Sequence, residues 1–256
     1  MASEGWSGKI REKIQAVISK HRIAGELFGK VSEDMDPGEI GGIWVKGGQD
    51  TEENGPGGES ITVLATPKFE QVAVSPISIK AQGNSASLFQ GQDPFGDYFL
   101  DDIGRRVAAQ ETTKLVRDLF DKAHEIKTME SQLTKSDVTE AAAWVRSNGH
   151  VPDTLLVHPQ RTVELVSRNE IRQKWDLPQF LWDKKGRPFV GFTNDIDIYW
   201  VAEMPLEMCL LYEKSETHVQ IGKVETKFAR ESFLVTERCL AWAYDANALA
   251  KISLAK

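Results

Sequence analysis

A stripe of apolar residues at helical spacing runs through the middle of this 256-residue sequence. Its members are Ile103, Val107, Ala108, Leu115, Val116, Leu119, Phe120, Ala123 and Ile126. The stripe predicts a helix of about 28 residues, roughly 40 Å long at 1.5 Å per residue. Asp101 and Asp102 favour its positive N-terminal end, and the cations Lys122 and Lys127 favour the other end. A helix of this length is typical of a structural spine.

The segment before the spine is rich in glycine. Residues 29–58 are interrupted by glycines throughout, and residues 49–58 are polar apart from Pro56. Residues 43–45 resemble a strand on one side, and residues 60–65 and 69–80 are rich in β-branched residues on the other. Two strand regions joined by a long, acidic, Gly-rich tip predict an extended hairpin arm, with a flexible surface loop as the alternative.

The N-terminal residues 6–24 predict an amphipathic helix. Ile10, Ile14, Val17, Ile18 and Ile23 recur at roughly helical spacing between charged residues. Two interpretations remain open. The helix is either an ordinary surface helix of the subunit or a terminal arm that docks on a neighbouring subunit.

The rest of the chain mixes short helices with strands. We expect a turn at 92–97, helices at 134–147 and 159–172, an irregular loop at 175–188 and a buried strand at 154–158. Thr134 or Ser136 caps the first of these helices, and Asn148-Gly149 ends it. Further strands are expected at 189–192, 196–202, 208–213, 218–228 and 232–244, with an unusually long final pair and a short tail at 246–254. The fold class is therefore α+β.

Catalytic and metal-binding patterns are weak throughout the sequence. It contains no phosphate-binding P-loop, no dinucleotide fingerprint, no zinc-protease motif and no serine-nucleophile elbow. His150 and His158 bracket a strand but have no thiol or carboxylate at ligand spacing. Asp195 and Asp197 are expected on the solvent face of a strand rather than around a cation. Cys209 and Cys239 are interpreted as small buried hydrophobic residues, so we expect no catalytic residues, no metal and no cofactor.

The net charge and the hydropathy limit the kinds of partner that we expect. The net charge is −7, and the basic residues are scattered, which disfavours a protein that wraps nucleic acid. The longest apolar runs, such as residues 208–212, are far too short to cross a bilayer, so no membrane partner is expected. A chain with a spine, a projecting arm and no catalytic constellation is more typical of an architectural protein than of an enzyme.

The order of these elements resembles the major capsid proteins of tailed phages and related viruses. These proteins share the Hong Kong-97-like fold with the shell proteins called encapsulins. Residues 94–108, PFGDYFLDDIGRRVA, resemble the start of that family's spine helix, and residues 155–159, LLVHP, resemble the strand and proline that begin its central axial helix. Residues 189–194 and the closing strands at 232–244 and 246–252 also resemble that family.

The resemblance implies a division of the chain. Residues 1–28 would be an N-terminal arm and 29–85 the extended loop. Residues 86–133 and 209–245 would form a peripheral domain with the spine helix, and 134–208 and 246–256 an axial domain. Contacts between subunits would come from the arm, the loop and the start of the spine. The candidate interface residues are Ile10, Ile14, Trp44, Lys46, Phe69, Val72, Phe95, Tyr98, Arg105 and Arg106.

The resemblance also implies a function. Copies of the chain would form pentamers and hexamers of an icosahedral virion capsid, assembled in the host cytoplasm around double-stranded DNA without sequence-specific contacts. Portal, scaffold or decoration proteins are further possible partners. An encapsulin-type compartment around a cargo enzyme is the alternative, and an unrelated enzyme or monomeric binding protein is the third. Lys46 and Asn194 are of the right type for the covalent cross-link that a minority of the family form, but cross-linking is not expected here.

Overall fold

The computed structural model describes residues 2–50, 64–82, 94–128, 131–167, 189–193, 195–202, 204–229 and 232–255. Its longer helices are α1 (Ala2–His21), α4 (Pro94–Phe120), α5 (Lys135–Ser147) and α6 (Pro159–Ser167), and α2 (Ala24–Leu27) is a single turn. The strands are β1 (Lys30–Met35), β2 (Gly42–Asp50), β3 (Leu64–Gln71), β4 (Ile77–Gln82), β5 (His124–Lys127), β6 (Thr154–Val157), β7 (Phe189–Thr193), β8 (Ile196–Trp200), β9 (Met208–Tyr212), β10 (Thr217–Gly222), β11 (Glu225–Ala229), β12 (Ser232–Glu237), β13 (Cys239–Ala243) and β14 (Leu249–Ser253).

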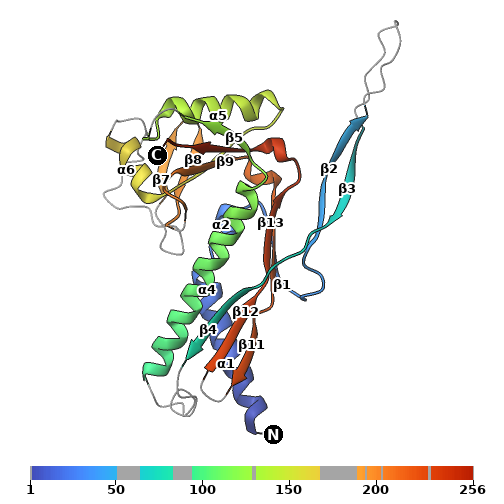
Figure 1. Ribbon diagram of the computed structural model, residues 1–256, viewed down its shortest axis with the longest axis vertical. Helices are drawn as coiled ribbons and strands as arrows, with labels where there is room; N and C mark the ends of the chain where they lie inside the picture. The colour runs from blue at the N-terminus through green and yellow to red at the C-terminus, as the bar shows by residue number, and fades with distance from the viewer. Residues whose placement is uncertain are drawn as a thin grey trace, which may run out of the picture.

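A mixed six-stranded sheet forms the lobe at one end of the molecule (Figure 1). Its strand order is β5-β14-β9-β6-β8-β7, and α5 packs on β14 and β9. The expected cap of α5 is confirmed. Thr134 accepts a hydrogen bond from Asp137 N, and the Asp137 carboxylate accepts one from Thr134 N at 2.8 Å. We call this lobe the axial lobe, because most of its strands come from the residues assigned to the axial domain.

The spine helix α4 leads away from this lobe, and α1 packs along it (Figure 1). Helix α1 buries Ile10, Ile14 and Ile18 in one apolar core with residues 100–108 of α4. The two helices approach closely at Gly104. A Cβ atom there would lie 2.5 Å from Val17 Cγ1, so this crossing requires glycine. The predicted helix at the N-terminus is confirmed, and it covers the spine of its own subunit.

Two long strands were expected at the end of the chain, but each is divided in two. β10 pairs with β13 and β11 pairs with β12, in both cases antiparallel. The register shifts between these pairings, because residues 222–224 lie opposite only residues 237 and 238. One extra residue in one strand is a β-bulge, which bends the pair and interrupts both strands. β1 extends the first pair and β4 the second.

The boundaries of other elements also differ from expectation. α4 begins at Pro94, in place of the predicted turn at 92–97, because proline suits the first position of a helix. It ends at Phe120. The apolar pattern continues to Ile126 because Ile126 is also buried, but as a residue of strand β5. The expected strand at 69–80 is split between β3 and β4. The predicted loop at 175–188 and the end of the helix at 159–172 lie outside the described residues.

The predicted domain boundaries need one correction. β5 and β9 were placed in the peripheral domain, yet both lie in the six-stranded sheet of the axial lobe. β9 is wholly apolar at its centre and is covered on both faces, with Leu211 in the core under α5 and Leu210 in the core shared with the spine. The chain therefore crosses between the lobes more often than the predicted ranges imply. No helix in the described ranges is long and apolar enough to span a membrane.

Candidate assembly arm and its joint to the body

Strands β2 and β3 form an antiparallel hairpin that projects from the body as an arm (Figure 1). Trp44 lies opposite Phe69, and the register shifts by one residue between Lys46 and Gln49. In the described part of the chain, the hairpin pairs with no third strand. The outer edge of β2 bonds the body through Gly42 O, Trp44 O and Lys46 N. The outer edge of β3 therefore presents the backbone donors and acceptors of the kind that other strands pair with. The predicted tip at 51–58 lies outside the described residues.

One face of the arm carries an exposed aromatic pair. The side chains of Trp44 and Phe69 are 54% and 52% exposed, and their ring centroids are 5.2 Å apart in an edge-to-face arrangement. A Cβ atom on Gly42 would lie 3.0 Å from the Phe69 ring, so the ring lies over this glycine. Cross-strand aromatic contacts of this kind stiffen a hairpin. Two large aromatic side chains left exposed side by side form a candidate contact surface.

The opposite face of the arm's root is anchored in the body. Ile43 is buried with Ile40 and Leu240, and Val45 and Val72 pack against this cluster. Gly41 begins the arm with a φ of +111°, and a Cβ atom there would lie 2.4 Å from Val72 O. Only glycine fits such a backbone. The root is therefore held in one direction, and Trp44 and Phe69 lie on the strand face opposite Ile43 and Val45.

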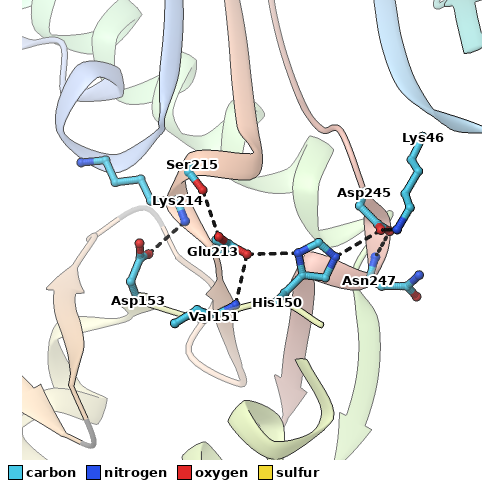
Figure 2. Close-up of polar contacts among 9 residues, drawn as sticks. All are labelled: Lys46, His150, Val151, Asp153, Glu213, Lys214, Ser215, Asp245 and Asn247. Carbon is cyan, nitrogen blue, oxygen red and sulfur yellow. Dashed lines mark hydrogen bonds and ion pairs between the residues drawn. The ribbon is translucent and has the colours of Figure 1, made fainter. Parts of the chain in front are cut away.

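Four ionisable side chains join the arm to the axial lobe, and we call Lys46, His150, Glu213 and Asp245 the joint (Figure 2). Lys46 Nζ donates to Asp245 Oδ2 at 2.6 Å, and Lys46 N donates to Tyr244 O at 2.7 Å. His150 Nε2 lies 3.1 Å from the same Asp245 oxygen, and His150 Nδ1 lies 3.0 Å from Glu213 Oε2. The joint thus links β2 with the segments that follow α5, β9 and β13.

The joint contains two possible cations and two carboxylates. A carboxylate only accepts hydrogen bonds, so both contacts of His150 are hydrogen bonds when the ring carries both protons. Burial of Asp245 by itself favours its neutral form, but hydrogen bonds from Lys46, the Asn247 backbone N–H and His150 outweigh burial and lower the pKa of Asp245 below its ordinary 3.8. The joint is therefore a compact set of mutually stabilising charges at the root of the arm.

The start of the spine helix offers a second exposed surface. Tyr98 is 76% exposed. Arg105 bonds Asp101 at 2.6 Å and Arg106 bonds Asp102 at 2.8 Å, each pair one helical turn apart and largely exposed. These pairs hold the two guanidinium groups along the outside of the spine. The side chain of Phe95 lies outside the described residues.

Four of the candidate interface residues are buried or partly buried by contacts within the subunit. Ile10 and Ile14 are buried against α4, Val72 packs in the root of the arm, and Lys46 belongs to the joint. We therefore leave these four out of the interface proposed below. Trp44, Phe69, Tyr98, Arg105 and Arg106 remain as exposed candidates.

The joint also shows what sequence reasoning missed. In the sequence, His150 was examined as a metal ligand and rejected, and no motif pointed to Glu213 or Asp245. The residues of the joint come from distant parts of the chain, so no local pattern connects them. Within the described ranges, no group of three or more His, Cys, Asp and Glu side chains is placed to hold a metal ion. Asp195 lies in a turn before β8 with a φ of +65°, so it does not share a strand face with Asp197 as expected.

Both cysteines are buried and free. Burial raises the pKa of Cys209 to about 12 and also raises that of Cys239, so neither thiol ionises near neutral pH. The interpretation of both as small buried hydrophobic residues agrees with these positions.

Solved structures of shell proteins share this arrangement. A virus-like particle from Pyrococcus furiosus matches with a TM-score of 0.62 and 13% identity, over 97% of this chain and 99% of that chain. The holo-SrpI encapsulin complex from Synechococcus elongatus PCC 7942 matches with a TM-score of 0.58 and 15% identity, over 88% and 84% of the two chains. The capsid of the Cyanophage P-SCSP1u matches with a TM-score of 0.53 and 13% identity, over 91% and 88%.

This chain has the Hong Kong-97-like shell fold. The fold expected from the order of its elements is therefore confirmed, as is its α+β class. No family model matches the sequence, and no curated protein matches it.

Proposed function

We propose that this protein is the structural subunit of a self-assembling icosahedral shell, with copies arranged in pentamers and hexamers. The observation that carries the proposal is the arm, whose root is fixed by the joint while its Trp44–Phe69 pair faces outward. An exposed aromatic pair beside the open edge of β3 suits docking on another protein chain. The shell fold makes a second copy of this chain the fitting partner.

The proposed contacts use two surfaces of each copy. The arm contributes Trp44 and Phe69, and the start of the spine contributes Tyr98, Arg105 and Arg106. Each contact is modest, but each subunit makes several, so assembly is cooperative even when single interfaces are weak. The role is structural rather than enzymatic.

For the contents of the shell, we favour double-stranded DNA held without sequence-specific contacts, in a virion assembled in a host cytoplasm. The net charge of −7 supports this, because a strongly cationic subunit would bind incoming DNA tightly. Portal, scaffold or decoration proteins would complete such a particle. An encapsulin-type compartment around a cargo enzyme is the alternative, favoured by the likeness to an encapsulin complex at a TM-score of 0.58.

Electron microscopy of particles isolated from the source cells tests both levels of the proposal. Closed shells with five-fold and six-fold clusters support the shell subunit. Nuclease-treated shells that still contain DNA support the virion, whereas shells with a second, enclosed protein and no DNA support the compartment. Absence of any shell, with the protein recovered as a 28.6 kDa monomer, contradicts both.

A further inference from the structure

A second charged cluster lies away from the arm, between α1 and the spine. Arg22 follows α1 and is only 1% exposed. Its Nε donates to both carboxylate oxygens of Glu111 on α4, at 3.1 and 2.9 Å. Its two terminal nitrogens donate to Glu33 of β1 at 3.0 Å and to Glu237 of β12 at 2.8 Å. One guanidinium therefore connects the end of α1 with three other elements.

The cluster holds more carboxyl groups than cations. Glu111 and Glu237 are almost fully buried, and Glu33 is half-exposed. Glu111 and Glu237 bond the same guanidinium, so their two carboxyl groups lie close together. Two carboxylates only accept, so a hydrogen bond between them requires a proton on one of them. Glu237 Oε2 is buried and receives no N–H or O–H donor from the described residues, which makes this oxygen the natural position for the proton.

The electrostatics of the site agree with a retained proton. Burial and the neighbouring Glu111 carboxylate raise the pKa of Glu237 to about 9, although Arg22 acts in the opposite direction. Burial likewise raises the pKa of Glu111. A single guanidinium does not compensate two buried carboxylates. Near neutral pH the cluster therefore carries one shared proton.

We infer that Arg22, Glu111 and Glu237 form a proton-dependent clasp, which holds the end of α1 on the spine while the proton is shared and loosens as that proton is lost. The rest of the contact between α1 and α4 is an aliphatic stripe and one exposed ion pair, in which Lys13 bonds Asp97 at 2.7 Å. Without the proton, two buried carboxylates repel each other around one cation. When the end of α1 moves away from the spine, water reaches both carboxylates and relieves this repulsion.

Other titratable groups near the clasp come from several elements. Lys114 bonds Asp118 at 2.8 Å on α4, one turn beyond Glu111, and Lys223, between β10 and β11, bonds Asp36 at 2.7 Å. The buried Cys239 thiol of β13 lies near Glu111 and Glu237. Lys20 and His21 precede Arg22 at the end of α1. All of these side chains are present in both the wild type and the variants below, so a difference between them reports the substituted carboxyl group.

The sign of the pH dependence follows from the two states of Glu237. With the clasp open, its carboxyl group is hydrated and titrates near its ordinary pKa of 4.5, and with the clasp closed it titrates at about 9. Opening between these values releases a proton. The equilibrium constant for opening therefore rises by up to about tenfold per pH unit and levels off above about pH 9.

Amide hydrogen exchange on the full chain tests this inference. Protection factors, which correct for the effect of pH on intrinsic exchange, are measured for α1 peptides between about pH 6 and about pH 9. In the wild type we expect protection to fall by up to about tenfold per pH unit. Glu237→Gln keeps an N–H donor in place of the proton, so its protection should stay level across the range. Glu225→Gln, an exposed glutamate of neighbouring β11, should keep the wild-type slope.

Two results would overturn the clasp. One is a wild-type protection factor that does not change with pH, which needs no variant to interpret. The other is a Glu237→Gln variant with the same slope as the wild type. If Glu237→Gln fails to fold, Glu111→Gln removes the other partner of the shared proton and should flatten the slope in the same way. The clasp lies within one subunit, so either failure leaves the proposed shell function untouched.

Discussion

Lys46 Nζ lies 2.6 Å from Asp245 Oδ2, although the two residues are 199 positions apart in the sequence. The pair fixes the root of the arm to the segment that connects β13 with the axial lobe. His150 binds the same carboxylate oxygen from the far side. The direction in which the arm projects therefore depends on a few polar contacts as well as on the apolar cluster around Ile43.

Replacing Lys46 with Met should loosen the joint without unfolding the subunit. The charge-assisted hydrogen bond to a largely buried carboxylate stabilises the fold by about 1–3 kcal/mol, and its loss should lower the free energy of unfolding by that amount. Urea denaturation measures the change. Lys68→Met on the exposed pair with Glu70 is the matched control, with an expected change below about 0.5 kcal/mol. Equal changes in the two variants would show that the joint adds nothing to the free energy of unfolding beyond an exposed ion pair.

The joint should weaken in acid. The pKa of Asp245 is lowered in the folded protein, so its contribution to stability is present above its ordinary pKa of 3.8 and is lost as the pH falls through the lower, folded value. Asp245→Asn removes this contribution. The difference in unfolding free energy between wild type and Asp245→Asn should therefore be larger at about pH 6 than at about pH 3. A difference that stays constant over this range would contradict the stabilised carboxylate.

The double variant Trp44→Ser/Phe69→Ser should fold normally and assemble only at a much higher concentration. Both side chains are half-exposed, so their removal costs the isolated subunit little. Aromatic anchors at an interface often contribute about 2 kcal/mol or more, which corresponds to an increase of about thirtyfold in the concentration needed for assembly. Light scattering against concentration measures this threshold. Lys68→Ser, the neighbour of Phe69 on the other strand face, should assemble like the wild type.

Leu119→Ala should affect folding itself. Leu119 is fully buried where the spine meets the core strands. Removing such a side chain lowers the free energy of unfolding by about 2–5 kcal/mol. Chemical denaturation checks the value, and Val163→Ala, a truncation at an exposed position on α6, should change stability by less than about 0.5 kcal/mol. An unchanged unfolding midpoint for Leu119→Ala would show that Leu119 does not contribute to the packing of the core.

Elements with local signals were predictable from the sequence. Helix α5 has its cap at Thr134 and its end at Asn148-Gly149, so its bounds depend on neighbouring residues only. The break between β10 and β11 could not be found in this way, because the bulge exists only through the pairing with residues 237 and 238. The end of α4 was predicted too late, at Ile126, for a related reason. Burial of Ile126 in β5 continues the apolar pattern of α4 beyond the real end of the helix.

The candidate site was predictable only in part. Trp44 and Phe69 were selected one by one from the sequence, but their contact follows from the register of β2 and β3. The joint and the clasp depend on residues brought together by tertiary structure, such as His150 with Asp245 and Arg22 with Glu237. No spacing in the sequence encodes either pair. Charged residues at distant positions are ordinarily solvated, and only the fold shows which of them are buried together.

Sedimentation velocity of the purified, full-length protein over a wide concentration range tests the central claim most directly. The account predicts closed particles far larger than a subunit, formed by the wild type and by Lys68→Ser, and formed by Trp44→Ser/Phe69→Ser only at a concentration about thirtyfold higher. A single 28.6 kDa species at every concentration would contradict it, because an arm of this kind has its proposed partner only on another copy of the chain.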